Sequence, residues 1–356
     1  MSEDKEPTVE DERNCVFMGR SHLVVLGAGA SRAAFPNGDR HGKKLPLMAD
    51  FVDTLELRPL LTQWGIDPDR NFEDIFSGIY EAGEADRIKI LQSRVEDYFG
   101  SLQIGDNPTI YDHLVLSLRK KDYIATFNWD PLLIQAYRRN GHFELPKLLF
   151  LHGNVGIGYC PKDRTVGVAG ARCSKCLQTF ARAPLLYPIK QKNYAANHFI
   201  ASEWDTFKRL LAHTFMVTIF GYSGPQSDQE ALSSMGAAWG PVRNRELEQT
   251  CFITVQNRDT VLRNFSEFVH THHYEIDSSF YNSWIAHHPR RTGEAWWNQY
   301  LECKFLPNNP IPINGNFAEL WSFFEPFREP ERVFEVAREN RENIDDGSPA
   351  LEKAKE

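Results

Sequence analysis

Three short motifs place glycine, amide, carboxylate and imidazole groups directly after runs of apolar residues. They are GAGAS at 27–31, TFNWD at 126–130 and LHGN at 151–154. Each apolar run predicts a buried strand, so each motif lies where a strand ends. The carboxyl ends of parallel strands share one edge of a sheet, and ligands bind at that edge. We therefore expect the three motifs to meet in one site.

The glycines of the first motif have two interpretations. Gly27 and Gly29 lack a Cβ, so the backbone can turn tightly and approach a ligand. A helix that starts after this turn would direct its N–H groups and the positive end of its dipole at a pyrophosphate. Arg32, however, stands where a complete GxGxxG motif has its third glycine. A tight strand-to-helix turn without a ligand is therefore the alternative.

The other two motifs supply polar groups that can act on a substrate. Asn128 carries an amide and Asp130 a carboxylate, although an Asp in this position can also simply cap a helix. His152 can serve as a base near neutral pH, although a single histidine is often structural. The order of these residues and their shared position at strand ends favour a common active site.

Two later segments repeat the pattern of polar groups after an apolar run. In FGYSG at 220–224, Gly221 permits a close approach of a ligand, and Ser223 can donate to a phosphate or a ribose. Asn257 follows the apolar run at 251–255, where its amide could bind a ribose hydroxyl. A plain turn residue within QNRD is the alternative for Asn257.

The elements that must position these groups alternate along the chain. Apolar runs predict strands at 23–27, 123–127, 148–153, 216–221 and 251–255. Helical spacing of apolar residues predicts helices at 79–99, 130–139, 202–215 and 259–273. Alternating strands and helices are typical of an α/β fold, here a Rossmann-like parallel sheet with helices on both faces.

Other segments interrupt or extend this rhythm. Residues 34–122 have a helical pattern and predict a helical insertion, and residues 155–182, rich in Gly, Cys and basic residues, predict a small module outside the sheet. We expect a flexible N-terminus at 1–20, a catalytic domain at 21–304 and a helical extension at 305–356. The aromatic segment FAELWSFFEPF in that extension could mediate assembly or pack on its own domain.

Composition excludes some classes of protein. The chain has 356 residues, of which 42% are hydrophobic and 25% charged, as in ordinary soluble domains. A net charge of −8 argues against a general nucleic-acid binder, which needs a basic face. Residues 138–192 hold ten Lys/Arg and two Asp/Glu, which predicts a solvated surface or, alternatively, a phosphate- or partner-binding patch. The N-terminus has no signal-peptide pattern and no apolar run is long enough to span a bilayer, so we expect a cytoplasmic protein.

Three of the six cysteines cluster in the predicted small module. Cys160, Cys173 and Cys176 lie within 17 residues, a spacing typical of a metal site. A structural zinc takes four ligands, commonly from two CxxC pairs. The residue three positions after Cys160 is Asp163, so a Cys3Asp site, a different fourth ligand, or the loss of zinc all remain open.

The ordered set of motifs resembles the sirtuin family over roughly residues 22–275. The resemblance implies an NAD-binding domain with a small, often zinc-bearing module inserted after a catalytic histidine. It implies that His152 is the general base acting on the ribose, that Asn128 orients ribose hydroxyls or a water, and that Asp130 supports the nicotinamide pocket. The residues that it places around the dinucleotide are Gly27, Ala28, Gly29, Ser31, Thr126, Gly221, Ser223 and Asn257.

Two features of the sirtuin deacylases are missing. Residues 33–40 read AAFPNGDR in place of a GIPDFR-like loop, and residues 183–194 read APLLYPIKQKNY in place of the FGE-x-LP-like strand that grips an acyl-lysine peptide. This layout resembles prokaryotic sirtuin-like effectors that hydrolyse NAD+, many of them in anti-phage defence. The resemblance implies an NAD+ glycohydrolase that releases nicotinamide and ADP-ribose, through an oxocarbenium-like transition state.

Two other functions stay open at this point. One is an NAD-dependent protein deacylase or ADP-ribosyltransferase, and the other is a non-catalytic module that senses NAD or ADP-ribose and assembles. Since unrestrained loss of NAD+ would kill the host, we expect control by homo-oligomerisation or by a separate sensor or ATPase/translocase (HerA-like) subunit. The chain has no P-loop of its own.

Overall fold

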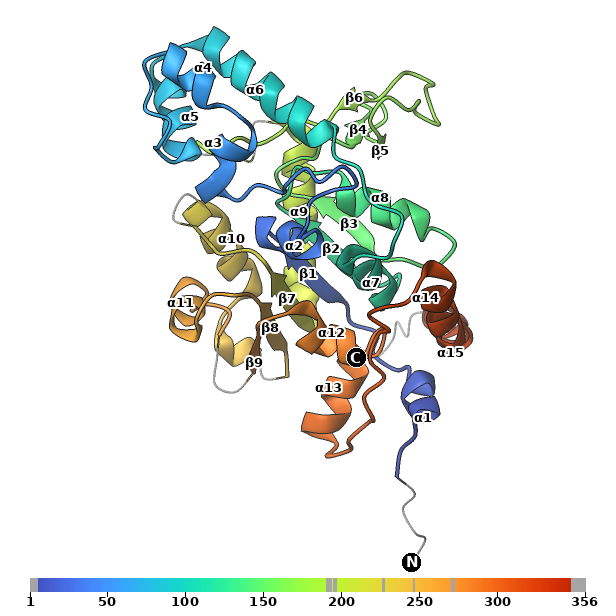
Figure 1. Cartoon of the computed structure of the whole chain (residues 1–356). Helices are drawn as coiled ribbons and strands as arrows, with labels where there is room; N and C mark the ends of the chain where they lie inside the picture. The colour runs from blue at the N-terminus through green and yellow to red at the C-terminus, as the bar shows by residue number, and fades with distance from the viewer. Residues whose placement is uncertain are drawn as a thin grey trace, which may run out of the picture.

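A six-stranded parallel sheet forms the centre of the computed structural model (Figure 1). The structure describes residues 6–346 except 190–193, 195–196, 226–227, 246 and 270–272. In spatial order the strands are β3 (Lys147–Phe150), β2 (Tyr123–Thr126), β1 (His22–Leu26), β7 (Met216–Phe220), β8 (Gln249–Ile253) and β9 (Tyr274–Asp277). The five predicted strands are confirmed. The edge strand β9 was missed, because its sequence YEID has no apolar run.

The register of the sheet brings the chemically active motifs together. Leu26, the last residue of β1, lies opposite Thr126 of β2 on one side and Phe220 of β7 on the other. All strand pairs in this sheet are parallel, so the chain leaves β1, β2 and β7 at the same edge. The residues that follow these strands are therefore neighbours in space although about a hundred positions separate them in the sequence.

Helices cover both faces of the sheet, as predicted. Side chains of β1 alternate between two cores, with Val24 and Leu26 in one and Leu23 and Val25 in the other. The first core includes residues of α2, α7 and α12, and the second includes residues of α9, α10 and α11. The bounds are α1 (Val9–Asn14), α2 (Ala28–Ala34), α3 (Phe51–Thr54), α4 (Arg58–Gln63), α5 (Phe72–Glu81), α6 (Ala85–Gly100), α7 (Ile110–Ser117), α8 (Leu132–Arg139), α9 (His198–His213), α10 (Gln229–Trp239), α11 (Arg258–Asn264), α12 (Trp284–His287), α13 (Thr292–Leu301), α14 (Phe317–Phe324) and α15 (Arg328–Asp346).

The insertion between β1 and β2 is helical, as the sequence predicted, but its helices differ in extent from the prediction. The helix expected at 79–99 is two helices, α5 and α6, because the chain turns at Gly83, whose φ is +72°. The helix expected at 259–273 covers only 258–264 as α11, and residues 270–272 of that prediction lie outside the described residues.

A separate three-stranded antiparallel sheet forms the small cysteine-containing module. Its order is β5 (Val166–Val168), β4 (Ile157–Tyr159), β6 (Ala181–Arg182). In Figure 1 these strands lie away from the main sheet, near the start of α8. The basic excess predicted for 138–192 includes exposed side chains of this module, such as Lys162, Arg172 and Lys175, while residues 190–192 lie outside the described residues.

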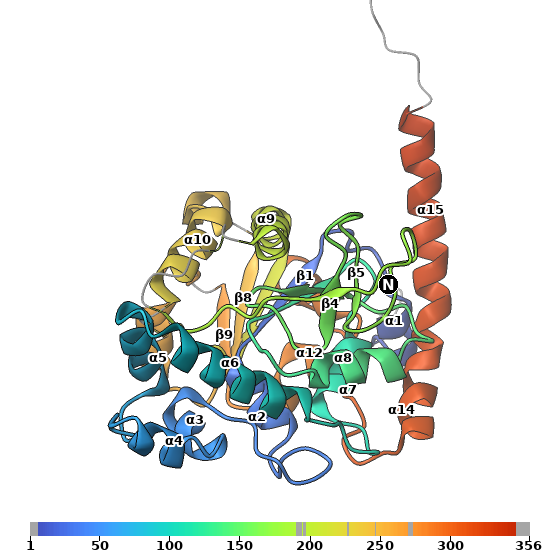
Figure 2. The ribbon, with the colours of Figure 1, turned by 90° about the horizontal axis from the view of Figure 1, so that it is seen from above.

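The N-terminal helix α1 packs against the C-terminal part of the chain. Residues 1–20 were expected to be flexible, and residues 1–5 of that prediction lie outside the described residues. Residues 9–14, however, form α1, and the buried carboxylate of Glu12 accepts a hydrogen bond from Asn309 at 3.1 Å. This buried hydrogen bond fixes α1 to the rest of the protein, which the charged composition of residues 1–20 did not predict. Helix α15 runs along one side of the molecule and its far end projects beyond the body (Figure 2).

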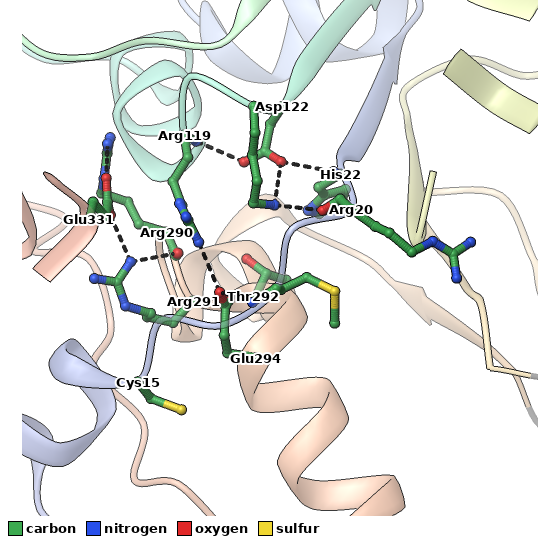
Figure 3. A network of polar contacts seen from close by, with 12 residues as sticks. Cys15, Arg20, His22, Arg119, Asp122, Arg290, Arg291, Thr292, Glu294 and Glu331 are labelled. Atoms are coloured by element: carbon green, nitrogen blue, oxygen red, sulfur yellow. Dashed lines mark hydrogen bonds and ion pairs between the residues drawn. The ribbon is translucent and has the colours of Figure 1, made fainter. Parts of the chain in front are cut away.

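The aromatic segment 317–327 packs on its own domain. Leu320, Phe324 and Phe327 are fully buried in the core that contains α7 and α8. Next to them, Glu331 of α15 forms ion pairs with Arg290 at 2.5 Å and Arg291 at 2.7 Å, in a buried polar network drawn in Figure 3. Among the described residues, no helix is long and apolar enough to cross a membrane.

Candidate active site

A cavity of about 550 Å³ lies at the carboxyl edge of the main sheet. Its lining includes most of the residues that the sequence singled out. These are Gly27, Ala28, Gly29, Ser31, Asn128, Asp130, His152, Gly221 and Ser223. Apolar walls come from the insertion between β1 and β2, including Leu45, Met48, Phe51 and Phe99. A volume of this size suits a small organic molecule, with a few polar groups available to fix its orientation.

Glycines at the carboxyl edge of the sheet allow the turn after β1 and the turn after β7 to contact each other. The N–H of Gly29 donates to the carbonyl of Gly221 at 2.9 Å, and a Cβ on Gly27 would lie 2.5 Å from the Cα of Tyr222. Gly221 has a φ of +63°, which favours glycine. Both turns line the cavity. Glycine is therefore required at these positions because any larger residue would clash between the two turns. The two turns together form one wall of the cavity.

The amide of Asn128 is held from behind by three acceptors. Its Nδ2 donates to the carbonyl of Gly27 at 2.9 Å, to Oγ of Ser31 at 2.9 Å and, more weakly, to the hydroxyl of Tyr111 at 3.3 Å. Because the nitrogen end of the amide is used in this way, its Oδ1 is the group that Asn128 presents to a ligand. An acceptor in that position suits a hydroxyl group or a water molecule.

Asp130 completes a line of hydrogen bonds behind the cavity wall. Ser31 donates its hydroxyl to Oδ2 of Asp130 at 2.6 Å, and the N–H of Leu132 donates to Oδ1 at 3.1 Å. Burial raises the pKa of Asp130, while these two donors oppose the rise because they favour the carboxylate. Asp130 thus binds the first N–H of α8, although the N-cap residue itself is Pro131, and the same carboxylate also fixes Ser31.

The loop that carries His152 is held by its neighbours in the fold. Its carbonyl accepts from the N–H of Leu186 at 2.9 Å, and Gly153 has a φ of +75° that places its missing Cβ against Pro184. Two successive residues of α9 form hydrogen bonds with the end of β3, just before His152. Glu203 accepts from the N–H of Phe150 at 2.7 Å, and Trp204 donates to the carbonyl of Leu151 at 3.0 Å.

Aromatic rings surround the imidazole of His152. Phe127 makes an edge contact with it at a centroid distance of 4.7 Å, and Tyr194 lies at 6.2 Å. On its other side Phe127 stacks on Tyr222 at 4.4 Å. His152 is 6% exposed and lines the cavity, so the imidazole works in a mostly dry environment with access to a bound molecule.

Two predicted residues lie elsewhere. Thr126 is buried at the end of β2, where its Oγ1 accepts from the N–H of Asn128 at 3.0 Å, so it supports the cavity wall without lining it. Asn257 caps α11, with its side chain accepting from the N–H of Thr260 at 2.9 Å. It is not among the residues that line the cavity. The turn role that the sequence left open for Asn257 therefore agrees with its contacts.

Asn154 and Tyr111 support the site from behind the cavity wall and had no role in the sequence analysis. Asn154 donates to the carbonyls of Asn128 at 3.2 Å and Asp130 at 2.6 Å, so it holds the loop that carries both. The position of Asn154 in the LHGN motif could have identified it from the sequence. Tyr111 lies on α7 in the insertion, fully buried, with its hydroxyl 2.6 Å from Oγ of Ser31. No pattern in the sequence marks Tyr111, because only the packing of α7 on α2 brings it to the site.

The cysteine module contains two turns with the same backbone geometry. In one, the N–H of Arg164 donates to the carbonyl of Cys160 at 2.9 Å, and in the other the N–H of Leu177 donates to the carbonyl of Cys173, also at 2.9 Å. Arg164 and Leu177 both have positive φ values, +54° and +62°. The repeated geometry makes Asp163 the counterpart of Cys176.

These two turns bring four potential metal ligands together. The ligand atoms of Cys160, Asp163, Cys173 and Cys176 all lie within 4.8 Å of one another. The Sγ atoms of Cys160 and Cys176 are 3.4 Å apart, and Cys173 Sγ is 3.2 Å from Asp163 Oδ2. Tetrahedral ligands at zinc–sulfur distances of about 2.3 Å stand about 3.8 Å apart, so the cluster fits a metal of this kind.

The solved structures to which this chain is similar include Sir2 proteins. One is a Sir2 homologue in complex with NAD, 13% identical, with a TM-score of 0.41 over 81% of this chain and 90% of that one. Another is a Sir2 protein bound to an acetylated peptide, 13% identical, with a TM-score of 0.37 over 73% of this chain and 88% of that one. No family model and no curated protein matches the sequence. The chemistry of the cavity is therefore taken from this chain's own residues.

Proposed function

We propose that this protein is an NAD+ glycohydrolase, which cleaves the bond between nicotinamide and ribose and releases ADP-ribose. The observation that carries the proposal is the arrangement of Asn128, His152 and Ser31 around one cavity, beside the paired turns at Gly27 and Gly221. This is the set of groups that the motif resemblance to sirtuins implies for a dinucleotide substrate. In this proposal His152 is the base, and Asn128 Oδ1 is a fixed oxygen that accepts a hydrogen bond from a hydroxyl group. The cavity of about 550 Å³ has room for a nucleoside.

The proposed reaction needs little acid catalysis. Nicotinamide leaves with the bonding electron pair and departs neutral, because it carries a positive charge in NAD+. The ribose carbon gains oxocarbenium character, and water attacks it. Asn128 Oδ1 orients the water or a ribose hydroxyl, His152 takes the proton that the attacking group loses, and the net products are nicotinamide, ADP-ribose and a proton.

Water, and not a peptide, is the proposed acceptor. Residues 183–189, which follow the cysteine module, contain no strand. Within them Leu186 is hydrogen-bonded to the carbonyl of His152, and Leu186 and Pro188 line the cavity. A peptide that paired as a strand would have no strand to pair with in this segment. Residues 190–193 of the region considered in the sequence lie outside the described residues.

The four-ligand cluster is proposed to bind zinc. Three thiolates and one carboxylate suit Zn2+, and its role would be to hold the two turns of the module together. The biological setting proposed from the motif resemblance is an effector of anti-phage defence in the cytoplasm, controlled by self-assembly or by a separate ATPase or sensor subunit.

Product analysis tests the activity. Purified protein is incubated with NAD+, alone and with the product of the neighbouring gene, and free nicotinamide and ADP-ribose are quantified. We expect equimolar products from the wild type and from His41→Ala, an exposed histidine outside the cavity. We expect at least roughly a 100-fold slower reaction in His152→Ala. Full activity in His152→Ala, or nicotinamide release that requires an acyl peptide, would contradict the proposal.

A further inference from the structure

The hydroxyl of Tyr111 lies directly behind two residues of the candidate active site. It is 2.6 Å from Oγ of Ser31 and accepts from Nδ2 of Asn128 at 3.3 Å. Tyr111 is 1% exposed and does not line the cavity, so it cannot touch a substrate. Its ring packs edge-on against Phe35 at 5.7 Å, which fixes the position of the hydroxyl.

The hydrogen positions along this line follow from counting donors. Ser31 has one hydroxyl hydrogen, and it points to the carboxylate of Asp130. Tyr111 must therefore donate to Ser31, and the resulting chain runs from Tyr111 through Ser31 to Asp130. Burial raises the pKa of Tyr111 well above its usual value, which keeps the hydroxyl protonated and able to donate. Each donor in such a chain strengthens the next.

The helix that carries Tyr111 is fixed at both ends. At its start, Asp112 accepts from Asn140 at 2.8 Å, and Asn140 in turn accepts from Trp321 of α14 at 2.8 Å. At its end, Arg290 donates to the carbonyls of Leu116 and Leu118, both at 3.0 Å, and is paired with Glu331 of α15 in the network of Figure 3. The C-terminal extension therefore holds α7 in place.

We propose that Tyr111 is a positioning residue for the reaction. By donating to Ser31, its hydroxyl fixes the direction of the Ser31–Asp130 hydrogen bond and leaves Ser31 as an acceptor for the Asn128 amide. The amide is then locked with Oδ1 toward the cavity. This inference rests on the proposed function, because it assigns Tyr111 a role in presenting Asn128 to NAD+.

The test is a double-mutant cycle on Tyr111→Phe and Ser31→Ala, with the KM for NAD+ as the readout. Phe keeps the ring and removes only the hydroxyl. We expect Tyr111→Phe to raise the KM about fivefold, the worth of one hydrogen bond. A loss of folded protein would lower kcat and leave the KM unchanged. In the Ser31→Ala background, we expect Tyr111→Phe to have a clearly smaller effect, since only the longer contact between the Tyr111 hydroxyl and Asn128 Nδ2, at 3.3 Å, then remains to be lost.

Tyr98→Phe is the matched control, because Tyr98 lies in the same insertion, does not line the cavity and donates its hydroxyl to the carbonyl of Lys44 at 2.7 Å. An unchanged KM in Tyr111→Phe, or effects that multiply in the double variant, would overturn the inference. If Tyr111→Phe does not fold, the Ser31→Ala variant alone tests the inference. A KM for NAD+ equal to that of the wild type in Ser31→Ala would then overturn the inference.

The proposed function is judged separately, on the wild type. If the wild type releases no nicotinamide, that proposal fails. The same cycle is then read from the Kd for NAD+ by calorimetry, with the same ratios expected and the same results overturning the inference. A wild type that neither cleaves nor binds NAD+ overturns both.

Discussion

Gly221 and Ala30 meet so closely that no side chain fits between them. A Cβ on Gly221 would lie 2.0 Å from the backbone nitrogen of Ala30, and 2.4 Å from the carbonyl carbon of Gly29. Gly221 also has a φ of +63°, and its N–H donates to the carbonyl of Ile253 at 3.0 Å. The contact joins the turn after β1 to the turn after β7, and thus closes one wall of the cavity.

Gly221→Ala should destabilise the protein. Both the backbone strain and the clash act in the same direction, so we expect the free energy of unfolding to fall by about 2 kcal/mol or more. Urea denaturation followed by circular dichroism measures this. Gly100→Ala is the control, since a Cβ on Gly100 meets nothing within 4 Å and the residue is helical. A Gly221→Ala variant as stable as the control would show that the turns can separate.

Asn257→Ala should affect stability and leave the affinity for NAD+ unchanged. Its side chain caps α11, so we expect a loss of about 1 kcal/mol in the free energy of unfolding. Asn128→Ala, measured alongside, should raise the KM for NAD+ or abolish turnover, because its amide lines the cavity. A raised KM in folded Asn257→Ala would instead assign it the ribose contact that the sequence suggested.

The metal prediction depends on Asp163. We expect elemental analysis of the wild type to find one zinc per chain, and Cys173→Ser to lose it. Asp163→Cys should retain the metal, because Cys is the residue that the matching turn has at position 176, whereas Asp163→Ala should bind it less tightly. Wild-type protein purified without metal from zinc-supplemented cells would end the prediction.

Glu203 should make stability depend on pH. Burial raises the pKa of Glu203 from its ordinary value of 4.5 to about 7, against the opposing effect of the Phe150 N–H. The folded state thus favours the protonated acid, and this stabilising contribution is lost as the pH rises from about 4.5 to 7. Relative to Glu203→Gln, the wild type should lose roughly 1–3 kcal/mol of unfolding free energy over this range. If the free energy of unfolding of the wild type and of Glu203→Gln changed with pH in the same way, the prediction would be refuted.

Glu331→Ala should loosen the C-terminal extension. Burial by itself would raise the pKa of Glu331, but Arg290 and Arg291 outweigh it and lower the pKa to about 2. The ion pairs therefore stabilise the fold above the ordinary pKa of the group, and the contribution is lost as the pH falls toward 2. Removing the carboxylate leaves two buried cations, so we expect a loss of about 3 kcal/mol near neutral pH. The exposed Glu329→Ala should cost less than about 1 kcal/mol.

The sequence by itself determined the parallel sheet and five of the polar residues that line the cavity. Short apolar runs such as LVVL and MVTIF, each followed by a glycine-containing turn, predict buried strands, and a polar residue directly after such a strand lies at the edge of the sheet. Asn128, His152 and Ser223 could therefore be found without coordinates. The edge strand β9 could not, because a half-buried edge strand needs no continuous apolar run.

Only the tertiary structure decided what holds these groups in place. Tyr111 reaches Ser31 across 80 residues of sequence, and Glu331 reaches Arg290 across 41, through contacts that leave no periodic pattern. The same holds for Asn257, whose amide is equally suited to a ribose or to a helix cap until its neighbours are known. Strand and helix patterns arise from burial along one element, whereas hydrogen-bond partners are chosen by packing between elements.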